Sequence, residues 1–100
     1  MSTTWAALAD PNRRQVLELL LERPRAVGEL VDWLGLSQPG ISKHFCVLCE
    51  AGLVKVRTEA QRRVYALQPR PLAELDAWLA PYRRLWSESL DALERHLDEE

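Results

Sequence analysis

The sequence predicts a mainly α-helical domain with a small β-hairpin, its elements in the order ααααββα. Two observations carry this prediction. One short helical pattern ends at Gly35 and another begins at Ser37, so only a tight turn fits between them, which is the layout of a helix-turn-helix. An alternating, β-like run follows at once, as a wing would. We therefore expect a winged helix-turn-helix, with the helix-turn-helix at 27–52 and the wing at 53–67.

The size of the chain fits a single domain spanning 1–100, and its 47% of hydrophobic residues is enough for one core. Because so small a domain buries a modest fraction of its surface, dimerisation would add burial. No apolar run approaches the roughly 20 residues of a membrane span, and the first residues lack the basic start and apolar core of a signal peptide. We expect a cytoplasmic protein with no membrane partner.

Charge is divided unevenly along the chain. The net charge is −2, but residues 11–70 hold ten Lys and Arg against six Asp and Glu, whereas residues 71–100 hold three Arg against eight Asp and Glu. The basic part coincides with the predicted helix-turn-helix and wing. This asymmetry is expected where one surface meets phosphate and another faces solvent.

The first three helices are expected at 4–9, from Pro11 up to Pro24, and at 26–34. Asp10 is a good N-cap for the second helix, and Pro11 stands at its first position, where a missing N–H costs little. Apolar residues at helical spacing should form its buried stripe: Val16, Leu17, Leu20 and Leu21.

The fourth helix is the one that would enter a DNA major groove. Ser37 is a favourable N-cap, and Pro39 falls in the first turn, where proline is tolerated. Ile41, Phe45 and Leu48 recur at steps of four and three, so we expect them to face the core.

The second half of the chain predicts a hairpin and then one long amphipathic helix. Strands are expected at 53–57 and 62–67, joined by a turn at 58–61. The final helix is expected at 71–97, with a kink or break at Pro81. Its apolar residues recur at steps of three and four: Leu75, Leu79, Tyr82, Trp86, Leu90, Leu93 and Leu97.

Several motifs carry a family resemblance. They are Leu8–Arg14, Leu36-Ser37-Gln38-Pro39, Ile41-Ser42-Lys43-His44-Phe45, Leu48, Ala51-Gly52-Leu53-Val54 and Ala80–Trp86. With these motifs the chain resembles the ArsR/SmtB family of bacterial winged-helix repressors over nearly its whole length. The last motif resembles a branch described as autorepressors without a known metal. The resemblance implies a homodimer joined through the first and last helices, which represses transcription until an effector lowers its DNA affinity.

The metal sites of that family are not matched. One needs cysteines in the first helix of the helix-turn-helix, where this chain has Glu29–Leu34. The other needs two pairs of ligands on the last helix. His96 and Glu99 match one pair, but Arg83 and Leu85 stand where the other belongs. We expect no metal and no cofactor.

Side chains of the recognition helix and wing are expected to contact double-stranded DNA. Glutamine can pair with an adenine edge and lysine with guanine or phosphate, and basic residues of the wing can reach the backbone or minor groove. The expected contacts are Ser37, Gln38, Pro39, Ser42, Lys43, Lys55, Arg57, Arg62 and Arg63. Glu59 at the wing tip argues against deep insertion. The alternative is that these are ordinary solvated faces, and His44 is expected to pack or hydrogen-bond rather than bind a ligand.

The apolar residues of the first and last helices are expected to form a dimer seam. They are Trp5, Leu8, Leu79, Tyr82, Trp86, Leu90, Leu93 and Leu97. A long helix with a wide apolar face must bury it somewhere, so a seam is simpler than the alternative, a ligand pocket.

Cys46 and Cys49 form an unusual pair, because the family often has Arg or Lys at these positions. Their spacing puts both sulfurs on one face of the recognition helix. The pair could bind a soft metal or metalloid, or be oxidised, although a zinc site wants four ligands. The alternative is that both are small packing residues, and two cysteines imply no disulfide framework.

The sequence contains no nucleophile–base constellation, glycine-rich phosphate loop or plausible carboxylate pair, so we do not expect an enzyme. We predict a homodimeric transcriptional regulator that represses an inverted-repeat operator, with an unknown effector. One alternative is a thiol- or metalloid-responsive repressor that uses the two cysteines. Another is a winged-helix module for protein–protein contact without DNA, which the acidic net charge permits.

Overall fold

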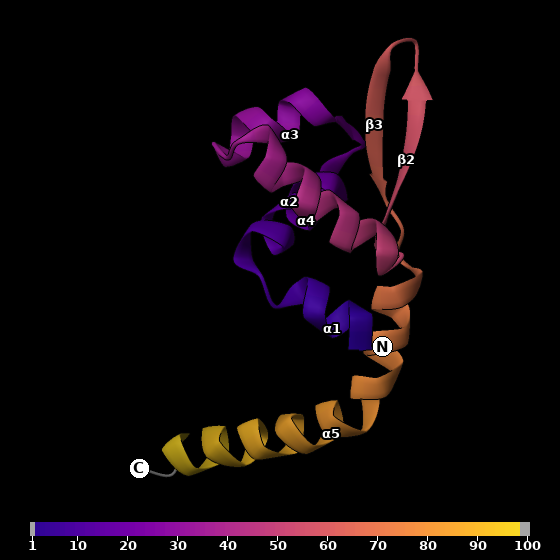
Figure 1. The fold of residues 1–100 in the computed structure, drawn as a ribbon. Helices are drawn as coiled ribbons and strands as arrows, with labels where there is room; N and C mark the ends of the chain where they lie inside the picture. The colour runs from indigo at the N-terminus through magenta and orange to yellow at the C-terminus, as the bar shows by residue number, and fades with distance from the viewer. Residues whose placement is uncertain (1, 99–100) are drawn as a thin grey trace.

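The computed structural model describes residues 2–98, and its order of elements is the predicted one with a short strand added (Figure 1). The elements are α1 (Ser2–Leu8), α2 (Pro11–Glu22), β1 (Arg25–Ala26), α3 (Val27–Leu34), α4 (Gln38–Glu50), β2 (Val54–Glu59), β3 (Arg62–Leu67) and α5 (Arg70–Asp98). The prediction of a mainly α-helical winged helix-turn-helix is confirmed. Within the described residues, no helix is both long and apolar enough to cross a membrane.

The start of α2 is fixed by the predicted cap. Asp10 Oδ1 accepts the backbone N–H groups of Asn12 at 2.7 Å and Arg13 at 3.3 Å. The Arg13 guanidinium donates to two carbonyls near the C-terminal end of α1, at 2.8 and 2.9 Å, and lies 3.3 Å from His44 Nδ1. Arg13 therefore joins α1 to α4, the predicted recognition helix. His44 takes part in a hydrogen bond, as was predicted for it.

The core lies between α2, α3, α4 and the base of the sheet. Its largest fully buried side chains are Leu30, Ile41, Leu48, Leu53 and Val16. Phe45 is buried with Ile41 and Leu48, as predicted. Leu21 does not belong to the buried stripe of α2, because its side chain is 75% exposed. At about 100° per residue it lies about 140° around the helix from Val16, beyond the buried sector.

The short strand β1 was not predicted. It pairs with β3 through Arg25↔Tyr65 and Ala26↔Val64, which gives the sheet order β1-β3-β2. Arg25 is buried, and its guanidinium donates to the Leu19 carbonyl at 2.9 Å and to Glu22 at 2.6 Å. These bonds satisfy the buried charge and hold Arg25 against α2. The pairing of β1 with β3 ties the α2–α3 connection to the wing.

The wing is longer and its turn shorter than predicted. β2 continues through Glu59, so only Ala60 and Gln61 connect the strands rather than residues 58–61. Ala60 takes φ 54°, a left-handed conformation that a two-residue hairpin requires and that asparagine or glycine normally supplies. Beyond Val54 the residues of β2 are exposed, and Figure 1 shows the hairpin extending away from the helices.

The last helix is continuous through Pro81 over 29 residues. Figure 1 shows that its direction changes part-way along, so that its C-terminal half runs away from the wing. Proline removes one helical hydrogen bond and clashes with the preceding turn, which accounts for such a bend. No residue of α5 that the structure describes is buried.

Candidate nucleic-acid interface

The turn between α3 and α4 sets the orientation of the recognition helix. Gly35 takes φ 64° and ψ 21°, and its N–H bonds the Val31 carbonyl at 3.0 Å, which closes α3 in a left-handed cap. Ser37 is extended, and its hydroxyl accepts the N–H of Gly40 at 3.4 Å. The chain can therefore reverse within three residues and start α4 on a new axis, with its buried face on the core.

The predicted DNA-contacting residues of α4 lie on its solvent side. Ser37, Gln38, Pro39, Ser42 and Lys43 are all exposed, while Ile41, Phe45 and Leu48 of the same helix are buried in the core. All five belong to the cap or the first half of the helix. This places polar and cationic side chains together at the end of α4 that a major groove would receive.

The wing cations are also exposed, but the register divides them between two faces. β2 and β3 pair Lys55 with Ala66, Arg57 with Val64 and Glu59 with Arg62. Directly opposed residues share a face of an antiparallel pair. Lys55, Arg57 and Arg62 therefore lie on one face, and Arg63, which opposes Thr58, lies on the other.

One wing cation, Arg57, forms an ion pair with Glu59. Arg57 Nη2 lies 2.9 Å from Glu59 Oε1, and both side chains are about half exposed. An exposed pair of this kind is worth little for stability, but it offsets the positive charge of Arg57 near the tip. The sequence showed Glu59 at the tip, and the structure shows which arginine it faces.

A small hollow lies between α3, α4 and β3. It measures about 170 Å³, and most of its lining residues are apolar or aromatic. Its charged and amide or hydroxyl side chains come from α4 and the wing: Gln38, Ser42 and Arg63. The aromatic wall is formed by Phe45 and Tyr65, whose rings stack with centroids 4.3 Å apart. The structure thus brings Arg63 into one cluster with two of the predicted α4 contacts.

Tyr65 was not among the predicted site residues. Burial raises the pKa of its hydroxyl, and the Cys49 thiol raises it further, while the positive charge of Arg63 acts in the opposite direction. The hydroxyl is therefore neutral at pH 7 and can accept from the guanidinium. Arg63 and Tyr65 are two residues apart on β3, and this spacing, which is visible in the sequence, places both side chains on the same face of the strand.

Both cysteines are exposed on α4. Cys46 Sγ donates to Glu50 Oε1 at 3.7 Å. Partial burial raises the pKa of the Cys49 thiol, and the neighbouring Cys46 raises it further. Residues 2–98 contain no group of three or more His, Cys, Asp and Glu that could hold a metal ion. Glu99, which matched a family ligand position, lies outside the described residues.

The predicted dimer residues of α1 and α5 form an aromatic cluster and an uncovered stripe. Trp5 is 45% exposed, and its ring meets the Trp78 ring edge-on with centroids 5.0 Å apart. The ring centroids of Trp78 and Tyr82 lie 4.9 Å apart. Leu8 and Leu79 are half-buried. The large apolar side chains of the C-terminal half of α5 are exposed: Leu85, Trp86, Leu90, Leu93 and Leu97. Trp78 and Leu85 were not in the predicted stripe.

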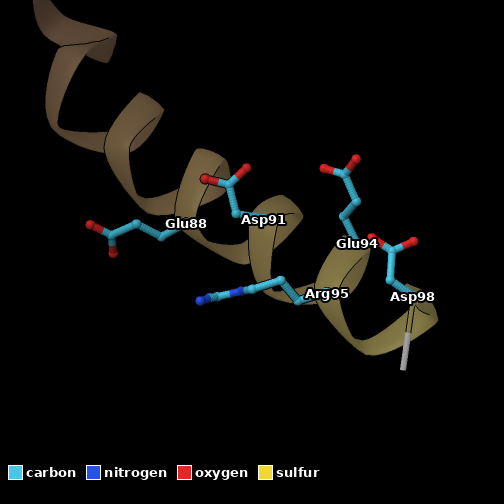
Figure 2. Close-up of a pocket in the computed structure, with 5 residues that line it drawn as sticks. All are labelled: Glu88, Asp91, Glu94, Arg95 and Asp98. Atoms are coloured by element: carbon cyan, nitrogen blue, oxygen red, sulfur yellow. The ribbon is translucent and has the colours of Figure 1, made fainter. Parts of the chain in front are cut away.

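The polar side of α5 is mainly acidic. Figure 2 shows Asp91, Glu94 and Asp98 extending from one side of the helix, and Glu88 and Arg95 from another. Figure 1 places this end of α5 far from the wing and α3. The acidic segment is therefore separated from the basic helix-turn-helix, as the charge distribution predicted.

Comparisons with known proteins agree with this geometry. The family model described as bacterial regulatory protein, arsR family, matches residues 10–56, which run from the cap of α2 into the wing. The HTH-type transcriptional regulator Rv2034 of Mycobacterium tuberculosis is 43% identical over 96 residues, which cover 96% of this chain and 87% of that protein. The chain belongs to the ArsR family.

Other members of the ArsR family support the same assignment. The transcriptional activator HlyU of Vibrio cholerae is 37% identical over 83 residues, 83% of this chain and 74% of that protein. The crystal structure of the ArsR family transcriptional regulator RHA00566 superposes with a TM-score of 0.77 at 32% identity, over 86% of this chain and 89% of the other. This ArsR-family protein is therefore a transcriptional regulator and belongs to a class without enzymatic activity.

Proposed function

We propose that this regulator is a homodimeric DNA-binding repressor that acts on an inverted-repeat operator in the cytoplasm. The observation that carries the proposal is the exposed polar start of α4, which includes Lys43 and where Gln38 and Ser42 line a hollow with Arg63 of the wing. A recognition helix contacts bases with its N-terminal residues, while the wing binds backbone or minor groove. The acidic face of α5 is directed elsewhere and would not repel the phosphates.

The uncovered apolar stripe of α5 supports a dimer. Five large apolar side chains between Leu85 and Leu97 are exposed, which is unusual for a stable monomer. A second copy, packed through α1 and α5, would cover them. A two-fold dimer sets its recognition helices about 34 Å apart, so that they enter successive major grooves of an inverted repeat. A bound dimer would block transcription where its operator overlaps a promoter.

The operator contacts are tested by Gln38→Ala and Lys43→Ala. Because both side chains are exposed, we expect unchanged thermal unfolding. Loss of Gln38 should cost about 1–3 kcal/mol of binding free energy at one operator position, whereas loss of Lys43 should also weaken binding to unrelated DNA if it binds phosphate. Fluorescence anisotropy on DNA from the chain's own promoter region, and on single-base variants of it, measures both effects.

Arg84→Ala is the matched control, since Arg84 is an exposed residue of α5. It should bind DNA like the wild type. If Gln38→Ala and Lys43→Ala also bind like the wild type, the assigned DNA face is wrong. Because the related HlyU is named an activator, a reporter assay with the same promoter must separate repression from activation.

A second candidate function is a thiol-responsive repressor, which the exposure of both Cys46 and Cys49 on α4 favours. A mercuric ion would displace two thiol protons and bridge the sulfurs. Arsenite would bind the two sulfurs with the release of two water molecules. Either adduct would add bulk beside the DNA-reading residues and release the DNA. The raised pKa of Cys49 lowers its thiolate fraction at neutral pH, which slows this reaction.

The test is titration of the reduced protein on its operator with mercuric ion, arsenite or a mild oxidant. The double variant Cys46→Ser, Cys49→Ser is the control. A sensor pair predicts that the wild type releases DNA and the double variant does not. If both proteins respond alike, or neither responds, the cysteines are not the sensor, and an effector would be sought at the seam of the last helices.

A further inference from the structure

The four predicted wing cations are not equivalent in their relation to the recognition helix. Alternate residues of a strand point to the same side, so Arg63 shares a face of β3 with Tyr65. That face is turned toward α4, because the Tyr65 ring stacks on Phe45 at 4.3 Å with an interplanar angle of 29°. Arg62 lies on the opposite face, across from Glu59.

Tyr65 is fixed more firmly than any exposed wing residue can be. It belongs to the central strand, opposite Arg25 of β1 on one side and Val56 of β2 on the other. Its side chain is only 6% exposed. The position of its hydroxyl is therefore set by the core and by α4 rather than by solvent.

Arg63 lies beside that hydroxyl. Its side chain is exposed, and its positive charge acts to lower the pKa of the Tyr65 hydroxyl. Both residues line the hollow that Gln38 and Ser42 also line. A free arginine loses much rotamer freedom when it binds a ligand, and a preset one loses less. The guanidinium fork suits a phosphate oxygen pair.

We infer that Tyr65 is a positioning residue that holds Arg63 against the recognition helix, so that Arg63 binds the DNA phosphate next to the bases that α4 reads. The inference rests on the proposed DNA-binding function. Arg62, on the other face of the hairpin, binds independently of Tyr65. The recognition helix and one arginine of the wing then act as a single preset surface, and the rest of the wing acts as a separate one.

The test is a double-mutant cycle built on Tyr65→Phe, which keeps the ring and its stacking on Phe45 and removes only the hydroxyl. Affinity for the operator should fall about threefold to tenfold. In an Arg63→Ala background, Tyr65→Phe should cause no further fall. In an Arg62→Ala background it should cause its full effect. Thermal unfolding of each variant, measured in parallel, shows whether the fold is kept.

Three outcomes decide the matter. A wild type that binds no DNA overturns the proposed function, and this inference with it. If the wild type binds but Tyr65→Phe binds equally well, the positioning role alone is wrong. It is also wrong if Tyr65→Phe weakens binding as much in the Arg63→Ala background as in the wild type, because the hydroxyl then acts through another group or through stability.

Discussion

Replacing Trp86 or Leu93 with glutamate is expected to convert the proposed dimer to a monomer and to abolish operator binding together with it. Trp86 is 44% and Leu93 54% exposed in the single chain, and both lie on the stripe that a partner helix would cover. A carboxylate in such a seam would lose its hydration without gaining a partner. Because each half-site then binds alone, affinity should fall by about 100-fold or more.

Size-exclusion chromatography with light scattering gives the mass of each variant, and anisotropy gives its operator affinity. Arg84→Glu is the control, since Arg84 is exposed about 160° around the helix from Trp86. It adds more negative charge than either variant but should stay dimeric and bind DNA. A wild-type monomer, or a Leu93→Glu variant that remains dimeric and tight-binding, would show that the seam lies elsewhere.

Of the variants proposed here, Phe45→Ala is expected to lower the free energy of unfolding most. The Phe45 side chain is 3% exposed and stacks on Tyr65, so it joins the inner face of α4 to the central strand. Truncating a buried phenylalanine costs about 3–5 kcal/mol, a large part of the 5–15 kcal/mol that is usual for a small domain. Urea unfolding followed by circular dichroism, at one fixed protein concentration, measures the difference.

Lys43→Ala serves as the control for Phe45→Ala, because it shortens an exposed side chain of the same helix two residues away. Its effect on stability should stay within about 0.5 kcal/mol. A loss below 1 kcal/mol for Phe45→Ala would mean that α4 is not anchored to the sheet through this ring, and the fixed position of Tyr65 would lose its basis.

Local signals made most of the fold predictable. Asp10 and Ser37 cap their helices through the backbone N–H groups that the sequence suggested, and Gly35 takes the left-handed conformation that ends α3. These effects act within one helical turn, so a single sequence displays them. The buried face of α4 follows from its periodicity in the same way.

Tertiary contacts determined what was missed. β1 has two residues, which is too short to show the alternation of apolar and polar residues that predicts a strand. It forms because Arg25 pairs with Tyr65, which is far along the chain. Trp78 lies beside the predicted stripe of α5 because Trp5 of α1 meets it there. The tight turn at Ala60 lacks the usual asparagine or glycine, so it gave only a moderate signal.

The candidate DNA site was predicted as a set of residues but not as an arrangement. The basic and polar side chains predicted for this site on α4 and the wing are exposed. The division of the wing cations between two faces depends on the strand register, and the pairing of Arg57 with Glu59 depends on the hairpin turn. Neither can be read from the composition of the segment.

The salt dependence of operator binding tests the account most directly, because the chain as a whole is acidic while its proposed DNA surface is basic. Each phosphate neutralised contributes about −0.9 to the slope of log affinity against log salt. We predict a steep negative slope for the wild type and a shallower one for an Arg62→Ala, Arg63→Ala double variant, with two chains bound per operator. A chain that binds no promoter DNA even at low salt, or binds with a slope that the double variant leaves unchanged, would contradict the account.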